Sequence, residues 1–197
     1  MLVQTGSVKR FNLSCLLLCT ISLAVALGFL HGAPVPPFTF PDEYRIGQYT
    51  LTLRGTGLVR ELFFIIVVAA ALYLQDGMPV EEALSDVGKR VEMQSFRTIP
   101  VEDFIREAEI ALAENVPAPT IDALRPRVDQ LHQAYEDLRP DDRYAITYLP
   151  GSGTRLELNG EVKVTIQGAD FAAAYFRVWL GDKPIHKKLK VQLLGGR

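Results

Sequence analysis

Arg60 and Glu61 are the residues whose types and position most suggest binding chemistry in this chain. They stand immediately before an unbroken apolar run, residues 62–74. So apolar a run is expected to be buried, and charged residues directly before it therefore need a partner or a function. Because successive strand residues point to opposite faces, Arg60 and Glu61 cannot simply neutralise each other. We expect one of them to face the interior or a cleft, and Arg60 to be either a structural ion-pair residue or an anion site.

Other residue types that could do chemistry are poorly placed for it. The histidines, His31, His132 and His186, are scattered, and none has metal-ligand spacing. His132 stands among polar residues of a predicted helix, which favours a solvated side chain. The sequence around Ser152 precedes a strand pattern, whereas a nucleophile elbow needs a helix, and the glycines at 55 and 57 also lack the helix of a phosphate loop. We therefore predict no metal site and no cofactor.

The N-terminal segment has the pattern of a secretory signal. Lys9 and Arg10 precede a mostly apolar stretch, residues 11–30. Small residues at 24–26 fit a cleavage site, but about 20 apolar residues could also remain as a membrane anchor. We expect residues 1–30 to be a signal peptide or an anchor. The protein would then be periplasmic, or held at the inner membrane facing the periplasm.

The exported part would carry neither cysteine, because Cys15 and Cys19 both lie in the signal segment. Removing residues 1–26 takes away two basic residues and no acidic one, which moves the formal net charge from −2 to −4. A mildly acidic domain argues against nucleic acid as a partner. The basic residues around Lys187 lack interleaved aromatic side chains, so we interpret them as the solvated face of a helix.

Beyond a Pro-rich linker at residues 31–41, residues 42–197 have the length and pattern of one α+β domain. Extended segments are expected at 49–53, at 62–74 after a glycine corner, at 89–99, and in a hairpin over 155–166 that turns at Asn159-Gly160. Helices are expected at 79–87, 100–115, 120–138, 170–181 and 184–194. This order predicts a large, mostly antiparallel sheet covered by helices.

A series of motifs runs along this domain: Gly57-Leu-Val-Arg60 leading into the run that ends Ala-Leu-Tyr-Leu74, Ser95-Phe-Arg97, Asn115, Tyr148-Leu-Pro-Gly151, Ile166-Gln-Gly-Ala-Asp-Phe171 and Val178-Trp-Leu-Gly181. Their order resembles that of bacterial chalcone isomerase-like proteins over nearly the whole domain. The resemblance implies an open-faced sandwich, in which a large antiparallel sheet carries a layer of helices. It also implies a ligand cleft between the sheet and the helices.

The plant isomerases of that family close a flavanone ring with an Arg, two Thr, a Tyr and an Asn. By motif these positions fall on Arg60, Val68, Ala108, Asn115 and Val178, so only Arg60 and Asn115 keep the family's residue type. Losing one preplaced donor to an oxyanion commonly costs about 3 kcal/mol of transition-state stabilisation. The resemblance therefore predicts no catalytic residues in this chain.

Non-catalytic relatives of the plant enzymes bind fatty acids, with the arginine holding the carboxylate. The resemblance thus implies a cell-envelope protein that binds a fatty acid or similar apolar carboxylate, with Arg60 as anion anchor and Asn115 as a second binding residue. One alternative is an intramolecular lyase or isomerase acting on an unsaturated carbonyl compound. Another is a membrane-tethered structural or interaction module in which Arg60 forms an ordinary ion pair.

Overall fold

Seven strands form one antiparallel sheet whose spatial order follows the order of the chain. The computed structural model describes residues 38–61 and 65–196. The strands are β1 (Glu43–Ile46), β2 (Tyr49–Glu61), β3 (Ile65–Gln75), β4 (Lys89–Ser95), β5 (Arg143–Leu149), β6 (Gly153–Leu158) and β7 (Glu161–Ile166). Each strand pairs with the next one along the chain, so the described sheet is a continuous meander.

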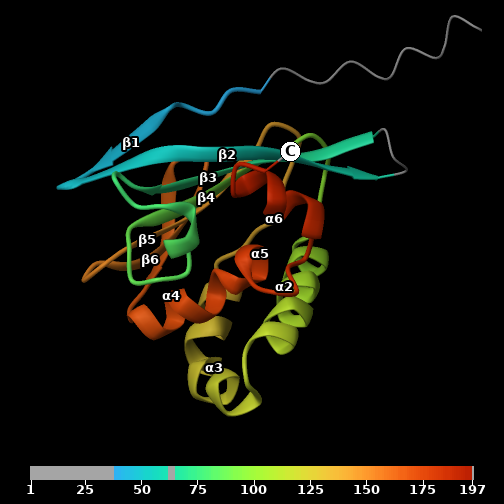
Figure 1. The fold of residues 1–197 in the computed structure, drawn as a ribbon. Helices are drawn as coiled ribbons and strands as arrows, with labels where there is room; N and C mark the ends of the chain where they lie inside the picture. The colour runs from blue at the N-terminus through green and yellow to red at the C-terminus, as the bar shows by residue number, and fades with distance from the viewer. Residues whose placement is uncertain (1–37, 62–64, 197) are drawn as a thin grey trace, which may run out of the picture. The chain divides into compact units, whose positions relative to one another are not determined.

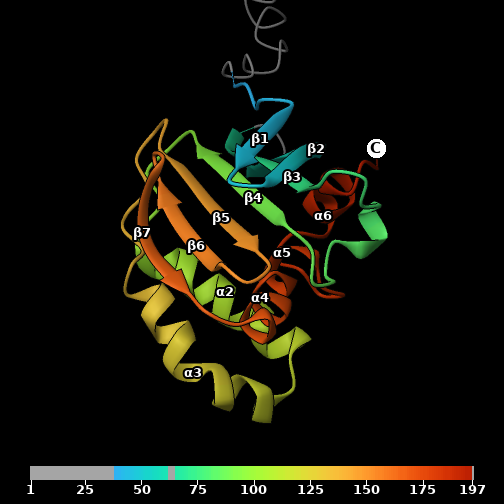
Figure 2. The same cartoon turned by 90° about the vertical axis from the view of Figure 1, so that its left-hand side faces the viewer.

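Helices form a layer on one face of this sheet, as Figure 1 shows for α2 to α6 below the strands. In Figure 2 α2 lies behind β6 and α3 lies below the strands. They are α2 (Val101–Asn115), α3 (Ala118–His132), α4 (Ala169–Tyr175), α5 (Arg177–Leu180) and α6 (Lys187–Leu193). The hydrophobic core lies between the two layers, where Leu72, Val91 and Ile146 of the sheet join Leu112 and Trp179 of the helices. The predicted α+β architecture, an open-faced sandwich, is confirmed.

Local sequence chemistry accounts for the elements that match their predicted ranges. The hairpin between β6 and β7 turns at Asn159 and Gly160, whose φ angles are 53° and 84°. Positive φ at both central residues is what a type I′ turn requires, and Asn-Gly tolerates it well. α2 follows Pro100 and ends at Asn115, because Pro is accepted at a helix start and the apolar residues recur at helical spacing.

Several element predictions differ from the structure in extent, among them the strand expected at 89–99, which ends at Ser95. Only a single turn of 3-10 helix, Val80–Glu82, forms within the helix expected at 79–87. α3 ends at His132, six residues before the predicted end at 138. The glycine corner is absent, since β2 runs unbroken from Tyr49 to Glu61, with a register shift between Leu53 and Gly55. The tight or bulged corner expected at 55–57 is therefore part of one strand, with a bulge-type register shift beside Gly55.

Glycine is needed in β2 because α6 packs directly against this strand. A Cβ atom on Gly55 would clash with the carbonyl oxygen of Gln192 and lie 2.7 Å from that of Leu193. On Gly57 a Cβ atom would lie 2.7 Å from Cδ1 of Leu189. The two glycines thus let the backbone of α6 approach the sheet closely, which is a packing role and not a turn role.

The substitution Gly55→Ala is expected to destabilise the fold by roughly 1–3 kcal/mol, because the clash is with main-chain atoms that cannot rotate away. Urea unfolding followed by circular dichroism measures this change. Thr56→Ala is the matched control, since Thr56 is exposed on the same strand. Equal midpoints for Gly55→Ala and the wild type would contradict the packing role.

The sheet face away from the helices carries a buried charge cluster that the sequence did not reveal. Val91 and Met93 belong to the core under the helices, so by alternation Arg90 and Glu92 point to the other face. The Arg90 guanidinium lies 3.0 Å from the Glu92 carboxylate and 2.5 Å from that of Glu157, and all three side chains are buried. Removing one of these side chains would leave a buried charge unpaired, so the three stabilise the fold only together.

Three predictions fall partly or wholly outside the described residues. These are the signal or anchor segment at 1–30, residues 31–37 of the linker and the start of the apolar run at 62–64. Within the part that the structure describes, no helix is long and apolar enough to cross a membrane.

Candidate ligand-binding site

A cavity of about 380 Å³ lies between one end of the sheet and the helices α2, α5 and α6. Its lining is mostly apolar, with charged side chains among it, and comes from β2, β3, β4, the segment before α2, α2 itself, α5, α6 and the segment between those two helices. The apolar lining residues are Val59, Val67, Val68, Met93, Ile99, Pro100, Phe104, Ala108, Val178, Ile185 and Leu189. A cavity of this size and polarity suits a small ligand with a large apolar part.

The positions inferred from the family resemblance converge on this cavity. Arg60 of β2, Val68 of β3, Ala108 of α2 and Val178 of α5 all line it. β2 and β3 pair antiparallel and place Val59 opposite Val68. Long-range pairing therefore gathers residues that lie far apart in the chain, and the three positions where the plant enzymes carry hydroxyl groups are aliphatic here.

A β-bulge controls how Arg60 and Glu61 are presented. The register between β2 and β3 shifts between Val59 and Arg60, which leaves Val67 as an extra residue of β3. A bulge interrupts strict alternation and redirects neighbouring side chains. Val59, Arg60 and Glu61 consequently all line the cavity, so both charges border it.

Glu61 is neutralised by Arg97 and not by its neighbour. Two nitrogens of the Arg97 guanidinium each lie 2.6 Å from a Glu61 carboxylate oxygen, in a bidentate pair. Both side chains are about half exposed, so this pair contributes little to stability and mainly orients the two groups. Sequence analysis missed Arg97, because nothing local indicates a partner 36 residues away.

The other charges at the cavity also belong to local pairs. Arg106 on α2 lies 2.6 Å from Asp103 and 3.7 Å from Glu107. Desolvation lowers the pKa of His186, against the opposing effect of Glu107. Among the described residues, no carboxylate lies within 4.0 Å of the Arg60 guanidinium. Arg60 is thus a cation of the cavity that is available to an anionic ligand.

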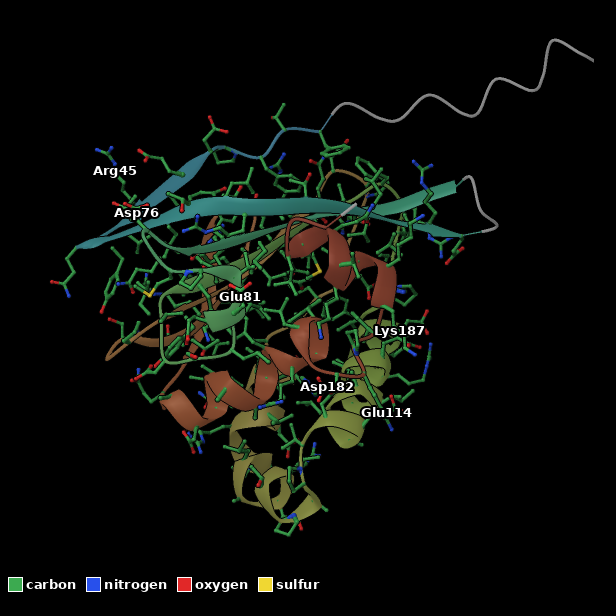
Figure 3. The ribbon with its side chains drawn as sticks, viewed as in Figure 1. Arg45, Asp76, Glu81, Glu114, Asp182 and Lys187 are labelled. Carbon is green, nitrogen blue, oxygen red and sulfur yellow. The ribbon has the colours of Figure 1, made fainter. Side chains whose placement is uncertain are left out.

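Asn115 is placed outside the cavity lining. Its Nδ2 donates to the carbonyl oxygens of Ala111, at 2.7 Å, and Lys183, at 2.6 Å, while its Oδ1 accepts from the backbone N–H of Lys183 at 2.9 Å. Figure 3 labels the neighbours of this contact, Glu114 at the end of α2 and Asp182 in the loop after α5. The structure therefore does not bring Asn115 together with Arg60, and the Asn115 side chain ties α2 to that loop.

The predicted solvated state of His132 was wrong. The side chain is buried at the end of α3, with Nε2 3.1 Å from Tyr175 Oη and Nδ1 3.3 Å from the Glu109 carboxylate. Burial lowers the pKa of His132, and the nearby carboxylate opposes that shift. The helix face looked polar in sequence, but in the fold His132 contacts Tyr175 of α4 and Glu109 of α2. No group of three or more metal-ligating side chains forms among the residues described.

Comparisons with known proteins agree with this geometry. A family model described as chalcone isomerase-like matches residues 34–195. A fatty-acid binding protein from Arabidopsis thaliana, known from a crystal structure, superposes with a TM-score of 0.61 at 15% sequence identity, covering 82% of this chain and 94% of the plant chain. No curated protein sequence matches significantly. At this identity the structural likeness concerns the fold.

Proposed function

This chain belongs to the chalcone isomerase-like family, and we propose that it is a non-catalytic protein that binds a fatty acid or a similar apolar carboxylate. One observation carries the proposal. Arg60 lines a cavity of about 380 Å³ whose lining is mostly aliphatic and aromatic, and no described carboxylate lies within 4.0 Å of the Arg60 guanidinium. An arginine can hold a carboxylate through two parallel hydrogen bonds, while the apolar walls take up the rest of the ligand.

The chemistry of the lining supports binding over catalysis. Among the described lining residues there is no Ser, Thr, Tyr, Asn or Gln side chain. Stabilising an enolate or a phenolate needs several preplaced donors, and Val68, Ala108 and Val178 offer none. Incubating the protein with a chalcone is therefore expected to show only the uncatalysed rate of ring closure. The fatty-acid binding protein of the same fold further supports an apolar carboxylate as the ligand class.

The test is a calorimetric titration of the wild type and Arg60→Gln with saturated fatty acids of increasing length. Charge-assisted hydrogen bonds contribute about 1.5–3 kcal/mol, so we expect the substitution to weaken binding roughly tenfold to a hundredfold. Arg45→Gln is the matched control, because Arg45 is an exposed arginine on β1 that pairs with Glu43.

A neutral ligand separates the role of the carboxylate from that of the apolar walls. The corresponding fatty alcohol should bind the wild type and Arg60→Gln with similar affinity, because it offers no charge to Arg60. If neither protein binds fatty acids, or if both bind them equally well, Arg60 is not the anchor.

We also propose that the protein acts in the cell envelope, after export through its N-terminal segment. The basic residues Lys9 and Arg10 ahead of an apolar stretch support this. Mass measurement of the protein recovered from its native compartment separates a cleaved signal peptide from a retained anchor. A full-length cytoplasmic protein would contradict export.

A further inference from the structure

A second cavity, of about 250 Å³, lies at the start of β4, away from the Arg60 cavity, which reaches β4 at Met93. It is lined by Ser85 and Asp86 ahead of the strand, Lys89 of β4, Tyr148 of β5 and the first residues of α4, including Asp170. The proposed fatty-acid site shares none of these residues. The two cavities are therefore independent sites.

Lys89 is a buried amine without an ion-pair partner in the described structure. Its side chain is 1% exposed, and Nζ donates to the carbonyl oxygen of Ser85 at 2.5 Å. Nζ also lies over the rings of Tyr148 and Phe176, 5.6 Å and 5.4 Å from their centroids. No described carboxylate lies within 4.0 Å of Nζ, and the Asp86 carboxylate instead accepts a hydrogen bond from Tyr148 Oη.

Burial of Lys89 increases the share of the uncharged amine. Desolvation lowers the pKa of Lys89 to about 8, although the Asp86 carboxylate opposes the shift. At pH 7 about a tenth of the Lys89 side chains would be neutral, on the order of 100-fold more than for an ordinary lysine. Only the neutral amine has the lone pair that attacks a carbonyl carbon.

We propose that Lys89 is a nucleophilic amine that forms an imine with a small, uncharged aldehyde entering this cavity. The Nζ lone pair forms the C–N bond to the aldehyde carbon, and the resulting carbinolamine then loses its oxygen as water. Both hydrogens of the released water come from the amine nitrogen, and its oxygen comes from the aldehyde. The reaction needs neither an oxidant nor a reductant. The small volume and the carboxylate of Asp86 disfavour anionic carbonyl compounds.

The test is reductive labelling of the folded wild type with propanal and cyanoborohydride, which converts the imine to a stable secondary amine. Peptide mass spectrometry then gives an initial rate for each lysine. At pH 7 we expect Lys89 to be labelled at least tenfold faster than the exposed Lys183, Lys187 and Lys188. The rate at Lys89 should level off above pH 8, while the rates at the exposed lysines keep rising.

Two variants control for the site. Lys89→Met keeps an unbranched apolar side chain without the amine and should lose the fast adduct, whereas Lys187→Met should retain it. If Lys89→Met does not fold, the pH profile of Lys89 in the wild type decides alone. The proposal is overturned if Lys89 reacts no faster than the exposed lysines, or if it reacts only after denaturant is added.

Discussion

Ala108→Phe is expected to abolish fatty-acid binding while the protein stays folded. Ala108 lies on α2 with its Cβ facing the Arg60 cavity, and a benzyl group there would occupy the space of the ligand's chain. Losing the apolar contacts of several methylene groups, at about 0.8 kcal/mol each, lowers affinity at least a hundredfold. Calorimetric titration with the fatty acid that binds the wild type most tightly measures this loss.

The matched control is Ala113→Phe, which makes the same chemical change at an exposed position of the same helix. It should bind the ligand as the wild type does. Thermal unfolding of both variants separates a filled cavity from a damaged fold. A wild-type affinity for folded Ala108→Phe would show that the ligand occupies a different part of the molecule.

Arg90→Met is expected to destabilise the protein by about 3–5 kcal/mol at pH 7, because it leaves buried carboxylates without their cation. Glu92 is 2% exposed and Glu157 9%, so neither can recover full hydration. Glu92 keeps its contact with Arg143, at 2.9 Å, whereas Glu157 has no other cation within 4.0 Å among the described residues. Urea unfolding at pH 7 measures the loss.

Two comparisons make this prediction specific. Arg45→Met removes an exposed arginine from an ion pair with Glu43 and should cost less than about 1 kcal/mol. The double variant Arg90→Met with Glu157→Leu removes both the cation and the carboxylate that depends on it, so it should recover part of the lost stability. A double variant that is less stable than the single one would contradict this account of the cluster.

The proposed function rests on a cation placed at an apolar cavity, and the family alone does not supply that arrangement. Val68, Ala108 and Val178 occupy positions where the plant isomerases carry hydroxyl groups, and all three line the cavity. The site thus keeps an arginine that can hold a carboxylate, and it carries aliphatic side chains at the three positions inferred for hydroxyl groups. Both features follow from side chains that the fold brings together from β2, β3, α2 and α5.

Parts of the fold could be predicted from sequence because their causes are local. The hairpin at Asn159-Gly160 follows from the φ angles that these two residues tolerate, and α2 follows from apolar spacing after Pro100. The alternation of the strands likewise indicated an antiparallel sheet under helices. The glycines of β2 misled the prediction, because a tight turn and a close helix contact both call for a residue without a side chain.

The sequence by itself determined the α+β class, most helices and strands, the family resemblance and Arg60 as the residue to examine. Only the tertiary structure decided that Arg97 pairs with Glu61, that Asn115 serves a loop contact, and that His132 and Lys89 are buried. The physical reason is the distance along the chain over which each effect acts. Helix and turn preferences act over a few neighbouring residues, whereas the pairing and burial of a charge depend on segments dozens of residues away.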